Sequence, residues 1–204
     1  KSLKRDDDEE MPSFGYRDPD GYWVKQHLNF PLSEEVSLRT DLYYYTQKGF
    51  KPTFDALYEH KDYTFQVSMG DYSNVSASSG DSAFGGSSNT VNWVTKQPEF
   101  RFDLLAKPIG KSPWKYHFTA LVGKWTDDTK TSWHHDYVLY FKREPIYLDK
   151  KKTWTWNNGF GLEQVRESYD GSVQNMVRYN TSISKKINSW SYAWTGYNYT
   201  NTNQ

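Results

Sequence analysis

The sequence predicts an all-β fold, an antiparallel up-and-down meander of about ten long strands that forms a transmembrane β-barrel or part of one. Apolar and polar residues alternate with a period of two along most of the chain, which is the pattern of β-strands. The alternating segments are roughly 9–12 residues long, which exceeds the usual 5–6 residues of a strand and is close to the length that crosses a bilayer. The chain also combines 17 Tyr, 9 Trp and 11 Phe with a polar mean hydropathy of −0.93, so large rings and polar side chains share the same strands.

Composition divides the chain into two regions. Residues 1–20 carry the acidic run Asp6–Glu10, followed by prolines and a glycine, and we expect a charged linker there. Residues 21–204 are expected to form the antiparallel β-barrel domain, complete or partial. Lys1 is not followed by the basic and apolar segments of a secretory leader, so we expect a mature form or a fragment.

The clearest strand lies over residues 36–46, where Leu38 and Leu42 fall on one face and Arg39 and Asp41 on the other. The same alternation predicts further strands over 22–30, 63–69, 115–122, 133–142, 173–183 and 190–194. The residues that we expect to face lipid are Val24, Leu28, Val36, Leu38, Leu42, Phe65, Val67, Phe118, Val122, Leu139, Phe141 and Val177. The cations on the opposite face, which are candidate lumen-facing contacts for anionic sugar or phosphate, are Lys25, Arg39, Lys115, Lys142 and Arg178.

The expected turns alternate between the two ends of the meander. Those at one end lie over 31–35, 59–62, 107–113, 144–150 and 184–189. Those at the other end lie over 46–49, 126–130, 167–171 and the Gly- and Ser-rich stretch 72–92, which we expect to be a long mobile loop. Pro52 and Pro98 are expected at strand starts or bulges, and Gly159 and Gly161 at a bend or at a close approach of another backbone.

Aromatic residues lie at or near the expected strand ends, namely Trp114, Trp125, Trp133, Trp154 and Trp190. In an outer-membrane barrel, Trp and Tyr at strand ends form girdles at the two membrane interfaces. In a soluble β-sandwich they would be core residues or platforms that stack on sugars. We favour the girdles.

Several classes of function are disfavoured. Lys plus Arg equals Asp plus Glu at 25 each, which gives none of the positive charge typical of nucleic-acid binding proteins. The absence of cysteine excludes disulfides, thiolate nucleophiles and cysteine-based zinc sites. No nucleophile elbow, phosphate-binding loop, zinc-protease motif or dinucleotide fingerprint occurs. We therefore expect no enzyme, and no catalytic, cofactor-binding or metal-binding residues.

The most tempting site is His134-His135-Asp136, because imidazole and carboxylate groups are metal ligands. Adjacent residues of a strand point to opposite faces, so His134 and His135 cannot both bind one ion without a distortion of the strand. We expect structural roles for these residues.

Three stretches of the sequence resemble the barrel domain of the LPS-assembly protein LptD family, also called OstA. They are Asp20-Gly-Tyr-Trp-Val-Lys-Gln-His-Leu-Asn-Phe-Pro-Leu, Asp41-Leu-Tyr-Tyr-Tyr-Thr-Gln-Lys-Gly-Phe-Lys-Pro and Lys124-Trp-Thr-Asp-Asp-Thr-Lys-Thr-Ser-Trp-His-His-Asp-Tyr. The chain differs from that family in having no cysteine, no terminal aromatic residue and fewer strands. It therefore resembles a short or divergent member.

The resemblance implies a protein of the Gram-negative cell outer membrane that takes part in lipopolysaccharide transport and assembly at the outer leaflet. It implies lipopolysaccharide and membrane lipids as partners, together with a plug lipoprotein and periplasmic transport-bridge proteins. From the balanced charge and the missing motifs we expect no nucleic acid as a partner and no cofactor. The same pattern also suits another barrel, such as a porin or an autotransporter translocator, and the alternative from a different class is a soluble, aromatic-rich β-sandwich that binds carbohydrate.

Overall fold

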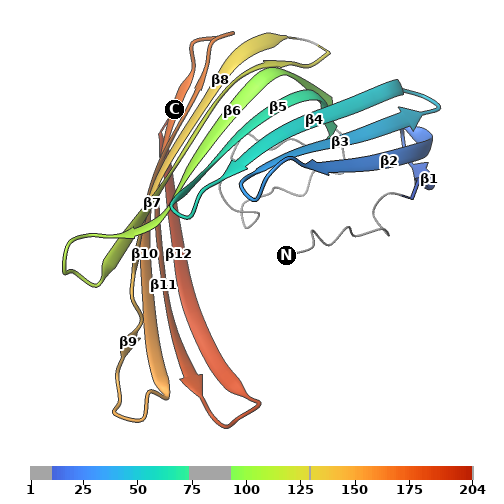
Figure 1. The fold of residues 1–204 in the computed structure, drawn as a ribbon. Coiled ribbons are helices and arrows are strands. Elements are labelled where there is room, and N and C mark those ends of the chain that lie inside the picture. Colours follow the sequence, from blue (N-terminus) through green and yellow to red (C-terminus); the bar gives the residue numbers. More distant parts are fainter. Residues whose placement is uncertain (1–10, 74–92, 129, 204) are drawn as a thin grey trace.

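The computed structural model describes residues 11–73, 93–128 and 130–203, and these residues form one antiparallel sheet of twelve strands. The strands follow one another in the order β1-β2-β3-β4-β5-β6-β7-β8-β10-β11-β12, and β9 pairs with β10 (Figure 1). Their bounds are β1 Ser13–Arg17, β2 Gly21–Pro31, β3 Val36–Tyr45, β4 Gly49–Glu59, β5 Tyr63–Ser73, β6 Trp93–Pro108, β7 Trp114–Thr126, β8 Thr131–Arg143, β9 Ile146–Tyr147, β10 Trp154–Glu167, β11 Val173–Lys186 and β12 Tyr192–Asn203.

The all-β antiparallel meander predicted from the sequence is confirmed. Ten of the strands have 10 to 16 residues, and only β1 and β9 are shorter. The breaks between the long strands fall where turns were predicted, at both ends of the meander. Across the described ranges there is no helix with the length and apolar character needed to cross a membrane.

Three details differ from the prediction. Ser13–Arg17, inside the expected linker, forms β1 and pairs with Gly21–Lys25 of β2. Two residues of the expected turn over 144–150 form β9. Trp190 lies in the turn before β12, so only Tyr192 and Trp194 of that predicted segment belong to a strand. Most of the stretch 72–92, expected to be a mobile loop, lies outside the described residues.

Bulges interrupt the regular pairing in the middle of the sheet. The register shifts between Ser68 and Gly70 in β5, and twice in β6, between Lys96 and Glu99 and between Leu104 and Lys107. Pro98 lies in the first shift of β6, where its missing N–H leaves no gap in a regular ladder. Bulges of this kind bend a strand and increase its twist, and Figure 1 shows a strongly curved sheet.

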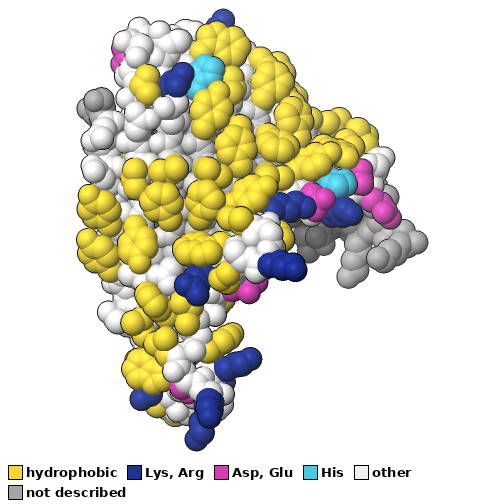
Figure 2. Space-filling view, turned by 90° about the vertical axis from the view of Figure 1, so that its left-hand side faces the viewer, with side chains coloured by type: hydrophobic (Ala, Val, Ile, Leu, Met, Phe, Trp, Pro, Cys, Tyr) yellow, Lys and Arg dark blue, Asp and Glu magenta, His cyan; other side chains and the backbone are white. Residues whose placement is uncertain are grey.

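The two faces of the curved sheet have opposite chemistry. Cross-strand partners share a face, so the register places Leu38, Ala56, Val67, Phe100 and Val122 in one row across five strands. Figure 2 views this face from outside the curve of the sheet, and hydrophobic side chains cover most of it. We call it the apolar face, and many of its large side chains are exposed, as Phe100 (41%) illustrates.

The opposite, inner face holds most of the buried residues, and most of these are polar. We call it the polar face. Its buried polar side chains include Thr53, Ser68, Glu99, Thr119, Ser132, His134, Asp136 and Glu163. The buried hydrophobic residues of the described chain, Tyr45, Leu121, Val138 and Val165, lie among them on the same face. The sheet therefore has its polar side chains inside and its apolar side chains outside.

Candidate functional site: the polar face

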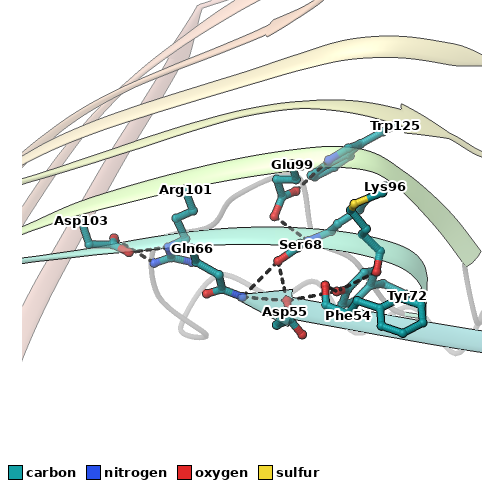
Figure 3. Close-up of polar contacts among 11 residues, drawn as sticks. Phe54, Asp55, Gln66, Ser68, Tyr72, Lys96, Glu99, Arg101, Asp103 and Trp125 are labelled. Atoms are coloured by element: carbon teal, nitrogen blue, oxygen red, sulfur yellow. Dashed lines mark hydrogen bonds and ion pairs between the residues drawn. The ribbon is translucent and has the colours of Figure 1, made fainter. Parts of the chain in front are cut away.

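A first group of polar contacts crosses β4 and β5. Asp55 Oδ1 accepts hydrogen bonds from Gln66 Nε2 at 2.9 Å, from Ser68 Oγ at 2.5 Å and from Tyr72 OH at 3.0 Å. Figure 3 shows these side chains pointing toward one another on the polar face. Neutral amide and hydroxyl donors thus fix the position of the Asp55 carboxylate.

A second group continues the same band across β6 and β7. The Glu99 carboxylate is 3% exposed and accepts from Lys96 Nζ at 2.6 Å and from Trp125 Nε1 at 2.7 Å (Figure 3). The Arg101 guanidinium donates to both oxygens of Asp103, at 2.6 and 3.1 Å. Charge-assisted and two-pronged contacts of this kind are the strongest hydrogen bonds in proteins, so they fix these side chains along the polar face.

A third group surrounds His134, whose side chain is fully buried. Its Nδ1 lies 2.5 Å from Glu167 Oε1, and its ring stacks on Trp125 with centroids 3.9 Å apart. Ser132 Oγ donates to the other oxygen of Glu167 at 2.6 Å. His135 pairs with Val122 and so lies on the apolar face. The two histidines therefore lie on opposite faces of the sheet, as expected. Within the described ranges, no three His, Cys, Asp or Glu side chains are grouped so that they could hold a metal ion.

Two lysine side chains also make contacts near the ends of the strands. The amine of Lys107 pairs with Asp62 in the β4–β5 turn and lowers the pKa of that carboxyl below its ordinary value. At the other end, Lys130 Nζ lies 4.0 Å from the centre of the Tyr169 ring, and its hydrogen bond with Tyr169 raises the pKa of the lysine. The first contact joins the β4–β5 turn to the end of β6, and the second joins turns that belong to different hairpins.

The five predicted lumen cations all lie on the polar face, but the structure does not gather them into one cluster. Lys25 pairs with Asp41 at 3.1 Å, Lys115 with Glu144 at 3.2 Å and Arg178 with Glu163 at 2.5 Å. Arg39 and Lys142 are exposed, and neither forms an ion pair with another described residue. The twelve residues expected to face lipid all share the apolar face.

Sequence reasoning missed the buried acids Glu99 and Glu163 of the polar face and the half-buried Glu167. The available signal was weak, because a carboxylate at a polar position of a strand does not show which cation lies opposite. One expected girdle residue was also misplaced: Trp125 lies on the polar face, where it donates to Glu99 and stacks on His134. Trp133 and Trp154 lie on the apolar face near strand starts, as expected for a girdle.

Comparison with known proteins finds no matching family model and no matching curated protein. Similar solved structures include a loop L8 deletion mutant of OmpT, an outer membrane protein of Vibrio cholerae, with 10% identity and a TM-score of 0.46 over 90% of this chain and 58% of that chain. They also include in-vitro folded OmpT in its trimer form (12%, TM-score 0.45, 90% and 56%) and the KdgM porin (12%, TM-score 0.30, 92% and 87%). This chain thus spans little more than half the length of the OmpT chains.

These comparisons correct one expectation. The absence of catalytic motifs led us to expect that the chain is not an enzyme, and with OmpT among the similar structures that exclusion is withdrawn. Identities of 10–12% neither assign nor exclude a catalytic activity, so enzyme status is unconfirmed.

Proposed function

We propose that the chain forms all or part of the wall of a β-barrel in the bacterial outer membrane. In this arrangement the apolar face contacts lipid, the polar face lines an aqueous lumen, and Trp133 and Trp154 belong to interfacial girdles. The observation that carries the proposal is the inverted distribution of side chains: Glu99 and Asp136 are buried, while Phe54 and Phe65 on the other face are 51% and 38% exposed.

This distribution is unfavourable for a sheet surrounded by water. Removing one Val, Leu or Phe side chain from water is worth about 1.5–3 kcal/mol, and the apolar face presents such side chains on every long strand from β2 to β11. A soluble carbohydrate-binding sandwich would cover this face with a second sheet. The described residues form a single sheet, so lipid is the solvent that suits the apolar face.

The cargo that we propose is lipopolysaccharide, on the basis of the resemblance to the LptD family. The exposed cations Arg39 and Lys142 on the polar face suit contacts with phosphate or acidic sugar groups. A plug lipoprotein and periplasmic bridge proteins are partners that follow from the same resemblance.

Neighbouring residues on opposite faces of β4 test the membrane placement. Ala56 lies on the apolar face between Leu38 and Val67, whereas Leu57 lies on the polar face between Ser37 and Gln66, and both are half-buried. Arginine near the middle of the lipid face of a barrel costs about 2–4 kcal/mol. We therefore expect Ala56→Arg to lower the free energy of unfolding in lipid vesicles by about that amount, and Leu57→Arg to lower it by clearly less.

The measurement is urea unfolding in vesicles, after a heat-modifiable gel shift has shown that each variant is folded. Equal losses for the two variants, or a cooperatively folded wild-type protein in detergent-free buffer, would contradict the membrane proposal.

The cargo is tested separately in cells with photo-crosslinking residues at Leu38 and Arg39. Transport through the lumen predicts lipopolysaccharide adducts at position 39. Adducts confined to position 38 would show that lipopolysaccharide is only a boundary lipid.

A further inference from the structure

A hollow of about 240 Å³ lies on the polar face where β7, β8, β10, β11 and β12 run side by side. Its polar lining consists mainly of His117, Tyr140, Lys142, Arg178, Asn180 and Asn198. Sites that enclose a whole small molecule usually measure about 300–1,000 Å³. This hollow is therefore sized for one unit of a longer molecule.

Two glycines make room for the ring that lines the hollow. A Cβ atom at Gly159 would lie 2.7 Å from Tyr140 Cζ, and one at Gly161 would lie 3.2 Å from Tyr140 Cδ2. The Tyr140 side chain therefore lies across both glycines, and any larger residue at Gly159 would displace it. From the sequence we expected a bend or a close approach of another backbone at these glycines, and the structure places an aromatic side chain against them. An aromatic ring on a wet surface is a platform for the C–H face of a sugar.

The charge beside this ring is an unbalanced cation. Lys142 lies directly opposite Lys115 in the register of β7 and β8, and like charges in this arrangement are destabilising. Lys115 is compensated by Glu144 at 3.2 Å, but Lys142 forms no ion pair with any residue that the structure describes. The carboxylate within the hollow, Glu163, is already held by Arg178 at 2.5 Å. An anion placed beside Lys142 would relieve the repulsion.

Carboxamides complete the lining. Asn180 and Asn198 are cross-strand partners on the polar face, and Asn180 Nδ2 donates to the Tyr140 hydroxyl at 2.6 Å. This bond fixes the ring and leaves the Asn180 carbonyl oxygen as an acceptor. Amide groups that both donate and accept match the hydroxyls of a sugar.

We propose that this hollow is a subsite for one acidic sugar unit, bearing either a carboxylate or a phosphate. Lys142 binds the anionic group, Tyr140 stacks on the sugar ring, and Asn180 and Asn198 bind its hydroxyls. The inference rests on the proposed function, because it requires that the polar face be in contact with water. The acidic unit can belong to a free oligosaccharide or to the sugar part of lipopolysaccharide.

The test is calorimetric titration of the full chain, refolded in detergent micelles and shown to be folded by its gel mobility. The probes are an oligogalacturonate, lipid-free lipopolysaccharide core oligosaccharide that carries phosphate, and a neutral malto-oligosaccharide of matched length. Lys142→Gln removes the anion contact, and Lys48→Gln is the matched control, because Lys48 is an exposed lysine in the turn between β3 and β4, outside the hollow.

We expect at least one acidic probe to bind more tightly than the neutral one, and Lys142→Gln to weaken that binding about ten-fold or more while Lys48→Gln leaves it unchanged. Binding of the core oligosaccharide would identify lipopolysaccharide as a source, and binding of oligogalacturonate alone would identify a free acidic saccharide. Equal affinity of the wild type and Lys142→Gln, or no preference for acidic probes, would overturn the subsite. Because folding in micelles is checked first, that result would leave the barrel proposal intact.

Discussion

Gly70 in β5 occupies a position that no other residue fits, and its replacement by alanine offers a quantitative test of the bulge in this strand. Its φ is +112°, a conformation that L-residues rarely adopt. A Cβ atom there would overlap the carbonyl oxygen of Pro52 and lie 3.0 Å from Thr53 Cα. Both obstacles are backbone atoms, which cannot turn away as a flexible side chain can.

The magnitude follows from the two contributions. The backbone conformation costs a non-glycine residue about 1–3 kcal/mol, and forcing an extra carbon into a closely packed site costs about 1–3 kcal/mol more. We therefore expect Gly70→Ala to lower the free energy of unfolding by about 2–6 kcal/mol.

Gly49 supplies the control for this prediction. Its φ is +74°, but nothing lies within 4 Å of a Cβ atom built there. Gly49→Ala should therefore lose only the conformational part, about 1–2 kcal/mol. Urea unfolding of both variants in the same detergent micelles, followed by tryptophan fluorescence, measures the difference. An equal loss for both, or a larger loss for Gly49→Ala, would refute the close approach of the Pro52 backbone.

Two further predictions concern charged groups outside the long strands. The Asp149 carboxylate accepts hydrogen bonds from the backbone N–H of Trp154 and from the backbone N–H and hydroxyl of Thr153. These hydrogen bonds lower the pKa of Asp149 below its ordinary value. The ionised carboxylate therefore stabilises this turn above about pH 3.9, and the stabilisation is lost as the pH falls through the lowered pKa. We expect proteolysis of the turn to increase in strong acid for the wild type. The Asp149→Asn variant should show no such pH dependence. Arg17→Ala should lower the free energy of unfolding by about 3–5 kcal/mol, because Arg17 contacts the fully buried Asp20 at 2.5 Å, and the double variant with Asp20→Asn should recover part of the loss in urea titrations. No recovery would mean that the buried charge is not the cause.

The division of the sheet into two faces could be predicted from the sequence because side-chain direction depends only on position within a strand. That is why Leu38 and Val177, far apart in the sequence, were assigned correctly to one face. The turns could be predicted for the same reason, since the alternation stops where Gly, Pro and charged residues begin. β1 was missed because its five residues lie between prolines and next to an acidic run, where local preference is weak.

The contacts of the polar face could not be predicted, because they depend on the register between strands. His134 finds its carboxylate in Glu167, 33 residues later. The bulges add a second difficulty: strict alternation would put Lys96 and Glu99 on opposite faces, yet the register shift between them places both on the polar face, where they form an ion pair. Alternation with a period of two therefore predicts the residues of the apolar face better than the contacts of the polar face.

The meander has a consequence for the order in which the sheet is assembled. Each strand is hydrogen-bonded to strands next to it in the sequence, except that β8 and β10 pair across the two-residue β9, so each new hairpin closes only a short loop and adds one new edge for the next. An error in the register of one strand pair, however, is passed on to every strand that pairs afterwards. A register slip of one residue in any hairpin would exchange the two faces of that strand, and every strand added afterwards would place its apolar side chains on the polar face of the sheet. The correct pairing of the whole sheet therefore depends on the register set at each turn, before the curved sheet has formed.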